Sequence, residues 1–285
     1  MSFLRRHTGN LIAYINSFIS RFSIQITKDQ RGYIRLLSIR NIRNLQDQMI
    51  EFLVPVFNGY DLIRVGNPSD GGYLLPDDLK FLDSCLSIGC DSVWSFEKSL
   101  HFLTGTSSHI LDEFDKKPHD LFSPHIYHSG LLGINNSPET ITLKSFIEKC
   151  AFTTSTNLIL QMDIEGAEYD ILLDIEDDQL LKFRIIVIEF HDFKRVREPE
   201  YLIEVVLPIF QKLANGFHLV HFHPNNCGGL FRFGKSFLPE VFEVTFHRKD
   251  RIKLLSKIER SLPHPFDYPN IVAKPDIVAI FRTYK

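Results

Sequence analysis

The chain has 285 residues, of which 44% are hydrophobic and 24% are charged, and its net charge is −3. This length and composition are ordinary for a soluble globular protein with one large domain, and the charge gives no basis for general nucleic-acid binding. The cysteines show neither C-x-x-C spacing nor a disulfide framework, so we expect reduced thiols in a cytoplasmic protein. They are Cys85, Cys90, Cys150 and Cys227.

The first 59 residues differ from the rest of the chain in charge, and we expect them to form an N-terminal helical segment. Residues 1–50 contain eight Lys or Arg against Asp29 and Asp47, a balance of +6, so the remainder carries −9. The apolar run near the start is too short and too polar to span a bilayer. A basic helix here could lie on the inner face of a membrane or pair two subunits of a homodimer. It could equally present a solvated Arg-rich face.

The apolar pattern then changes from helical spacing to alternating elements. Apolar residues recur at helical spacing over residues 30–54, which predicts a helix that ends before Pro55. Short apolar runs predict strands near residues 84–88, 108–111, 124–127, 157–162, 184–190, 217–222 and 241–247. Mixed segments at 94–104, 138–150, 166–175 and 200–214 could each form a helix. This alternation is typical of an α/β fold with a mostly parallel sheet covered on both faces.

The last third of the chain has a different pattern of apolar residues. The segments FHLVHFHP (217–224) and EVFEVTFHRK (240–249) alternate clearly between apolar and polar residues, which favours an antiparallel edge of the sheet. The Pro-rich tail from about residue 260 is expected to wrap the domain or cover a pocket.

The run QMDIEGAEYDILL, residues 161–173, carries the strongest functional signal. It follows the apolar NLIL and places Asp163, Glu165 and Glu168 at or just beyond a strand end, with Gly166 able to form a sharp turn. An ionised carboxylate is costly to bury unless it binds something, so these acids suggest a site. By physical reasoning alone, a solvated helix start that favours acids through its dipole explains them equally well.

The string MDIEGAEYDIL resembles the D-x-E-G-A-E motif of FkbM-type methyltransferases. The segments RVGNPSDGGYLL, CLSIGCDSVWSFE, ILDEFD, IIVIEFHDF, FHLVHFHPNN and PEVFEVTFHRK follow in the order that this family uses. The resemblance covers roughly residues 60–250. It implies a methyltransferase domain over residues 60–285 with a Rossmann-like class I sheet whose final strand is antiparallel. It also implies an S-adenosylmethionine-dependent O-methyltransferase that acts on a hydroxyl of a sugar, polysaccharide or related metabolite.

The resemblance places cofactor-binding residues at the strand ends, where open α/β sheets bind ligands. Gly89 ends the first strand, although many methyltransferases have two or three glycines there and this chain has one. The polar residues Asp91 and Glu97 follow it and could meet the amino-acid end of the cofactor. The entry segment DGGY supplies Asp70, Gly72 and Tyr73. For the ribose hydroxyls, Asp115 fits the family pattern best, with Asp112 as its close rival.

Methyl transfer to a hydroxyl also needs a residue that positions the cofactor and a base that takes the proton. The resemblance places Asp163 beside the methyl sulfonium. His191 in IEFHDF is the first choice for the base, and His221 and His223 are rivals on one strand face. Asp163, Glu189, His191 and His223 could instead hold Mg²⁺ or Mn²⁺.

Two other functions stay open at this point. Asp163 and Glu165 could form the metal-binding acidic pair of a nucleotide-sugar glycosyltransferase, although the GAEYDIL continuation argues against it. The single glycine after the first strand also fits a non-catalytic methyltransferase-like scaffold. For the enzyme, we expect a small-molecule or glycan acceptor.

Overall fold

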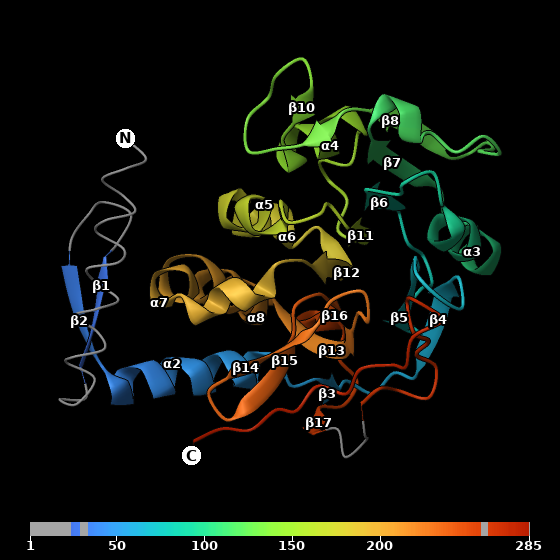
Figure 1. Ribbon diagram of the computed structural model, residues 1–285. Coiled ribbons are helices and arrows are strands. Elements are labelled where there is room, and N and C mark those ends of the chain that lie inside the picture. The colour runs from blue at the N-terminus through green and yellow to red at the C-terminus, as the bar shows by residue number, and fades with distance from the viewer. Residues whose placement is uncertain (1–23, 29–33, 258–261, 285) are drawn as a thin grey trace.

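The computed structural model describes residues 24–28, 34–257 and 262–284, and a seven-stranded sheet is its central element (Figure 1). The sheet order is β13-β16-β12-β11-β6-β7-β8, and β16 is antiparallel to both of its neighbours while the other pairs are parallel. The mostly parallel α/β sheet with an antiparallel closing strand is therefore confirmed. Its strands are β6 (Ser84–Ile88), β7 (Ser108–Asp112), β8 (Ile126–Ser129), β11 (Leu158–Met162), β12 (Phe183–Phe190), β13 (Phe217–Pro224) and β16 (Phe242–Arg248).

The strand order creates a crevice between β6 and β11. From β6 the chain builds β7 and β8 toward one edge, and it then returns to place β11 on the opposite side of β6. Ligands bind at such a reversal in open α/β sheets, beyond the carboxyl ends of the strands. Gly89 and Asp163 directly follow β6 and β11, so both lie at this position.

Helices cover both faces of the sheet, as the continuous burial of its central strands β6, β11 and β12 requires. Leu158, Leu160 and Met162 of β11 pack into one core with α2, α5 and α8, whereas Ile159 packs into a second core with α3 and the β4–β5 hairpin. Figure 1 shows these two layers on opposite sides of the sheet. The helices are α2 (Ile39–Phe52), α3 (Ser95–Thr104), α4 (Leu143–Lys149), α5 (Glu168–Asp174), α6 (Asp177–Leu180), α7 (Pro199–Tyr201) and α8 (Leu207–Gly216).

Short strands complete the fold outside the main sheet. They pair as β1 with β2, β3 with β17, β4 with β5, β9 with β10, and β14 with β15. Their bounds are β1 (Ile24–Lys28), β2 (Ile34–Ser38), β3 (Val56–Phe57), β4 (Leu62–Gly66), β5 (Gly72–Pro76), β9 (Leu131–Leu132), β10 (Thr140–Ile141), β14 (Leu230–Phe233), β15 (Ser236–Pro239) and β17 (Ser256–Lys257).

The predicted helix over residues 30–54 is wrong in its first part. Residues 34–38 form β2, which pairs antiparallel with β1, and the helix begins at Ile39. Apolar residues at 24, 26, 34 and 36 recur with period two, which fits a hairpin better than a helix. The apolar run of residues 1–20 and its membrane contact lie outside the described residues. Within the described part of the chain, no helix is long and apolar enough to cross a bilayer.

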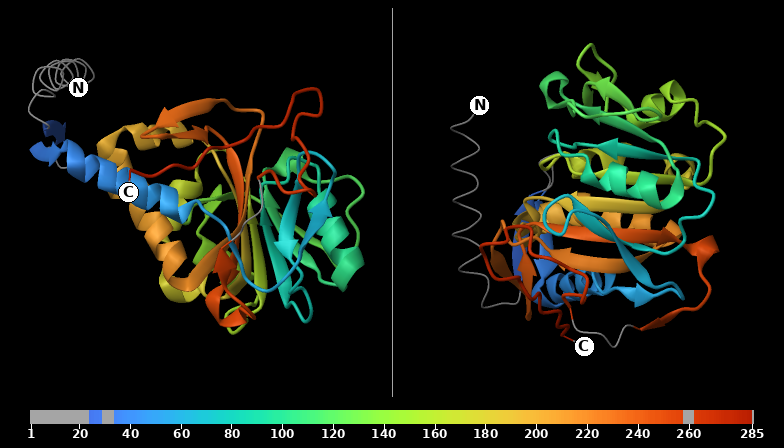
Figure 2. Two further views of the ribbon diagram at one scale, coloured as in Figure 1. Left: turned by 90° about the horizontal axis from the view of Figure 1, so that it is seen from below. Right: turned by 90° about the vertical axis from the view of Figure 1, so that its right-hand side faces the viewer.

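The C-terminal segment, residues 262–284, runs along the outside of the domain (Figure 2). Asn270 contacts Asp70 beside the β4–β5 hairpin, Ile280 forms a bridge with Phe237 of β15, and the Tyr284 amide donates to Asp47 of α2. This segment covers polar residues of β13 and β16, so the clear alternation of those strands does not mark a solvent-exposed face.

Candidate functional site

A cavity of about 660 Å³ opens at the carboxyl ends of β6, β7 and β11. Five of the residues predicted to bind the cofactor line it, and they come from three separate parts of the chain: Asp70, Tyr73, Gly89, Asp91 and Asp163. Two others, Gly72 and Asp115, are not among the lining residues.

Gly89 is required by close packing at the floor of this cavity. Its φ is +76°, and a Cβ atom here would lie 1.8 Å from the carbonyl oxygen of Asp163. Any side chain would therefore force β6 and β11 apart at their carboxyl ends. The single glycine after the first strand is accounted for by this contact, independently of a cofactor.

Gly72 has a different structural reason. It pairs with Gly66 at the end of the β4–β5 hairpin, and a Cβ atom here would lie 2.0 Å from the Asn67 carbonyl oxygen. The glycine therefore allows the hairpin to close. The hairpin in turn brings Asp70 and Tyr73 to the cavity wall.

The three acids at the end of β7 and just beyond it have different positions. Asp112 Oδ2 accepts hydrogen bonds from the amides of Cys90 and Asp91 at 2.7 and 2.9 Å, so this carboxylate holds the turn after β6. Glu113 lines the cavity, and none of its contacts within the described residues occupies its carboxylate. Asp115 is exposed in the following 3₁₀ turn. The geometry thus favours Glu113, which the sequence patterns missed, over Asp115 as an acceptor for a ligand in the cavity.

Glu97 supplies a buried acid to the lining of the cavity. It extends from α3, accepts a hydrogen bond from Ser87 Oγ, and leaves Oε2 buried without a partner among the described residues. Burial raises the pKa of Glu97. A buried carboxyl with an unpaired oxygen in a cavity wall is suited to receive a cationic or hydrogen-bonding ligand group.

The turn that carries Asp163 is organised by Glu168. Its side chain is fully buried, and Oε1 accepts hydrogen bonds from the amides of Ile164 and Gly166 at 3.2 and 3.1 Å. Gly166 has a φ of +107° and Glu165 one of +54°, so the backbone turns sharply between β11 and α5. The last acid of the motif therefore shapes the loop, while the first one faces the cavity.

His191 lies beside this turn, just past the end of β12. Its Nδ1 atom donates to Glu168 Oε1 at 2.9 Å, which leaves Nε2 facing three further carboxylates. Burial alone would lower the pKa of His191, but the hydrogen bond to Glu168 and the nearby charges raise it overall. The distances from Nε2 are 3.5 Å to Glu165 Oε2, 3.7 Å to Asp163 Oδ1 and 3.7 Å to Glu189 Oε1.

Asp163 joins the cavity to His191. It lines the cavity, yet its Oδ1 atom is buried and accepts no hydrogen bond within the described residues. Burial raises the pKa of Asp163 to about 7, although His191 opposes the shift. The pKa of Asp163 therefore lies in the range that general acid–base catalysis uses.

A row of polar side chains extends from this pair across the sheet. Glu189 of β12 stands opposite Glu243 of β16, and Glu243 stands opposite His223 of β13. Asn225 donates to Glu189 Oε1 at 2.7 Å, and Asn270 from the C-terminal segment donates to Glu243 Oε1 at 2.6 Å. Burial and the charge of Asp163 raise the pKa of Glu189 well above its usual value.

Two overlapping groups in this region have the donor spacing of a cation site. The ligand atoms of Asp163, Glu189 and His191 lie within 4.8 Å of one another, as do those of Asp70, Glu189 and Glu243. Glu189 Oε2 is buried and unpartnered within the part of the chain that the structure describes. His223, predicted as a fourth ligand, belongs to neither group.

His223 is held between two carboxylates instead. Nδ1 donates to Glu243 Oε2 and Nε2 donates to Asp276 Oδ1, both at 3.3 Å, so both ring nitrogens carry protons. Burial opposes this charge, but the two hydrogen bonds raise the pKa of His223 to about 10. Such a histidine keeps its proton at neutral pH, which argues against its role as a base. His221 is likewise paired, with Asp267 at 3.0 Å.

Comparisons with known proteins give one family match. Residues 79–229 match the family model described as the methyltransferase FkbM domain. No curated protein sequence matches the chain. Among solved structures, a 30S ribosomal A1408 methyltransferase from an uncultured bacterium (UncKam) is similar at 13% identity, over 78% of this chain and 98% of that one. Its TM-score is 0.29, which is too low to support an inference about function.

Proposed function

Because this chain belongs to the FkbM methyltransferase family, we propose that it methylates a hydroxyl oxygen of a sugar, polysaccharide or related metabolite with S-adenosylmethionine. The observation that carries this proposal is the position of Asp163. It lines the cavity at the carboxyl ends of β6 and β11, and its buried Oδ1 atom lies 3.7 Å from His191 Nε2. The two residues thus connect a cofactor-sized space with a titratable base.

The residues of the cavity fit this cofactor. S-adenosylmethionine supplies a methyl group on a cationic sulfur that leaves as a neutral thioether. Asp163 and Glu97 each have a buried carboxyl oxygen without a partner among the described residues, and we assign these two residues to the sulfonium and ammonium charges. Glu113 offers a carboxylate to the ribose hydroxyls. Tyr73 stays a neutral donor in the wall, because burial and the charges of Asp163 and Glu189 raise the pKa of its hydroxyl well above the usual value.

His191 acts as the base in this proposal. Glu168 holds the Nδ1 proton and so fixes the tautomer in which Nε2 can accept one. As the acceptor oxygen forms its bond to the methyl carbon, the hydroxyl proton passes to Nε2. Asp163 compensates the positive charge that develops on the imidazole, and its own ionisation near neutral pH makes that compensation available.

A divalent cation is a second way to use the same residues. Asp163, Glu189 and His191 form an oxygen-rich set with one imidazole, which suits Mg²⁺ or Mn²⁺. The buried Oε2 of Glu189, which has no partner among the described residues, favours this candidate. A bound cation would lower the pKa of the acceptor hydroxyl, and His191 would then be a ligand and not the base.

The acceptor is proposed from the family resemblance, and a glycan of the cell envelope is our choice. Attachment to an anionic membrane or to a second subunit through the basic N-terminal segment stays a prediction. The family match favours methyl transfer over the nucleotide-sugar glycosyltransferase considered above.

Calorimetric titration with S-adenosylhomocysteine tests the proposal, with UDP-sugars plus Mn²⁺ as the parallel arm. We expect micromolar binding of the first ligand and none of the second. Binding of UDP-sugars alone would instead support a glycosyltransferase. A folded protein that binds neither ligand would support a non-catalytic scaffold.

A further inference from the structure

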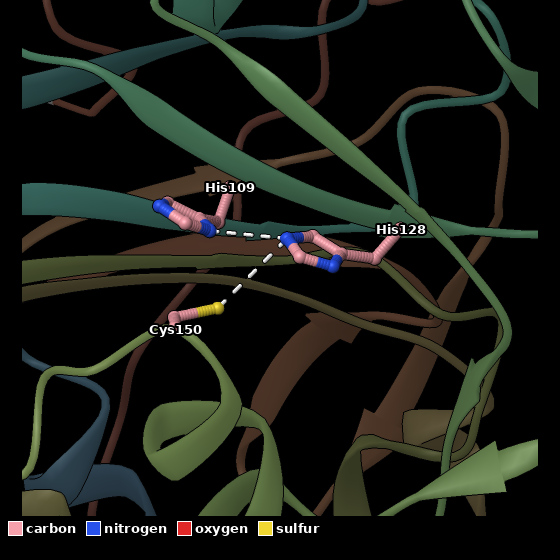
Figure 3. A group of neighbouring side chains, drawn as sticks. All are labelled: His109, His128 and Cys150. Atoms are coloured by element: carbon pink, nitrogen blue, oxygen red, sulfur yellow. Dashed lines mark hydrogen bonds between the residues drawn. The ribbon is translucent and has the colours of Figure 1, made fainter.

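A second group of metal-ligating side chains lies away from the cavity, at the β8 edge of the sheet (Figure 3). His109 belongs to β7, His128 to β8, and Cys150 ends α4. None of the three lines the cavity described above. Their ligand atoms all lie within 4.8 Å of one another.

Strand register brings the two histidines together. β7 and β8 pair with Leu111 opposite His128, so His109 and His128 are diagonal neighbours two positions apart and point to the same face. His109 Nδ1 lies 3.0 Å from His128 Nε2. Aromatic edges hold both rings, since Phe152 packs against His109 and Phe146 of α4 packs against His128.

Cys150 completes the group from the end of the helix. Its Sγ atom lies 3.9 Å from the same Nε2 atom of His128. A thiol from the end of α4 and an imidazole from β8 therefore lie close enough to share one metal ion. Figure 3 shows the two ring nitrogens and the sulfur directed toward a common centre.

We propose that His109, His128 and Cys150 bind a zinc ion, which links edge strand β8 to β7 and to the end of α4. Tetrahedral zinc, with Zn–N of about 2.0 Å and Zn–S of about 2.3 Å, places two nitrogens roughly 3.3 Å apart and a nitrogen and a sulfur roughly 3.5 Å apart. The observed 3.0 and 3.9 Å differ from these values by a few tenths of an ångström, and the ligand atoms of His109 and Cys150 lie within 4.8 Å of each other. Three protein donors leave one position, which water can reach because both histidines are half-buried.

The two imidazoles are in the form that binds a metal, whereas the thiol is not. Burial lowers the pKa of His109, and it lowers that of His128 to about 4, so both imidazoles are neutral and can coordinate. Burial raises the pKa of Cys150 to about 12, with Lys149 opposing the shift. Zinc must therefore displace the thiol proton, and binding releases it to solution.

The donor set also separates this site from the one beside Asp163. Two imidazoles and a thiolate select zinc over Mg²⁺, whereas the carboxylate-rich group of Asp163, Glu189 and His191 suits Mg²⁺ or Mn²⁺. The zinc touches no reacting group in the proposed chemistry. It supports the cavity wall, because Leu111 and Leu131 lie next to these strand positions and line the cavity.

Cobalt substitution tests the proposal on the untagged full-length chain. The metal-free protein is titrated with Co²⁺, and we expect a thiolate-to-cobalt charge-transfer band that one equivalent of Zn²⁺ removes and excess Mg²⁺ does not. Cys150→Ser should abolish the band. His128→Gln should weaken Co²⁺ binding by more than about 100-fold, beyond the usual effect of losing an outer-shell partner.

Cys227→Ser is the matched control, since Cys227 is exposed and lies apart from the group. This variant should keep the band. A band that survives in Cys150→Ser, or that disappears in Cys227→Ser, would overturn the assignment, as would the absence of any band in the native chain. His109→Gln, read together with circular dichroism, separates the loss of a ligand from the loss of the fold.

Discussion

Glu168 accepts a hydrogen bond from His191 at 2.9 Å and thereby joins the first turn of α5 to the loop after β12. The same oxygen, Glu168 Oε1, also accepts hydrogen bonds from the backbone amides of Ile164 and Gly166. Tyr169, the next residue, donates from its hydroxyl to the carbonyl of His191 at 2.9 Å. One buried carboxylate therefore sets both the turn that carries Asp163 and the orientation of the imidazole that Asp163 faces.

Replacing Glu168 by Gln tests this relationship. Gln keeps an oxygen for the two amides but removes the negative charge, so the pKa of His191 should fall and turnover should decrease. Glu168→Ala should in addition lower the free energy of unfolding by about 2 kcal/mol, because buried donors lose their acceptor. NMR titration of His191 and chemical denaturation measure the two effects. Asp170→Asn, at an exposed position on the same helix, is the control, and an unchanged His191 pKa in Glu168→Gln would contradict the assignment.

Asp163→Asn should separate activity from stability. Turnover should fall by about 100-fold or more, because the charge that supports the imidazolium is lost. The raised pKa of Asp163 means that the folded protein binds more protons than the unfolded chain between about pH 4 and about pH 7, so this residue lowers stability as the pH rises through that window. The stability of the Asp163→Asn variant relative to wild type should therefore increase over the same range, as urea denaturation at several pH values can measure. Wild-type turnover in this variant would remove Asp163 from the mechanism.

The ribose-binding acid can be identified with two matched variants. Glu113→Gln should weaken S-adenosylhomocysteine binding by roughly 10- to 100-fold, the effect of losing hydrogen bonds to a charged acceptor. Asp115→Asn should leave the affinity unchanged, because Asp115 does not line the cavity. Calorimetry on both variants decides between them, and the opposite result would restore Asp115 as the sequence pattern predicted.

His223 should contribute to stability and not to proton transfer. Its pKa of about 10 lies above the unfolded value near 6.5, so its stabilising effect is complete below about pH 6.5 and is lost as the pH rises through 10. His223→Gln should lower the free energy of unfolding at neutral pH by about 3 kcal/mol, because Glu243 and Asp276 lose their cation. The variant should also lose the decline in stability between neutral and alkaline pH. A native pH profile with reduced turnover alone would instead support a catalytic role.

The order of strands and helices along the chain could be predicted from the sequence. Apolar runs predicted all seven strands of the main sheet within a few residues, and the helical segments between them hold α3, α4, α5 and α8. These features depend on periodicity over short stretches, which a sequence displays directly. The error at residues 34–38 arose where a short hairpin precedes a helix, and neighbouring apolar residues satisfy both periods for a few positions.

The candidate site could be predicted from the sequence only in part. Asp163, Gly89 and His191 stand at strand ends, so their meeting follows from a parallel sheet. The separate roles of Asp112, Glu113 and Asp115 could not be predicted from the sequence. These three acids lie within four residues, and the sequence does not show in which direction each side chain points.

The sequence by itself determined the α/β class, the strand-end motif and the resemblance to one family, because these are properties of neighbouring residues. Only the tertiary structure decided which side chains meet. Glu168 reaches His191 across 23 positions, and Asp276 reaches His223 across 53. Strand order, register and the path of the C-terminal segment set those contacts. They also set which carboxylates are desolvated, and therefore which residues can hold a charge, a proton or a metal.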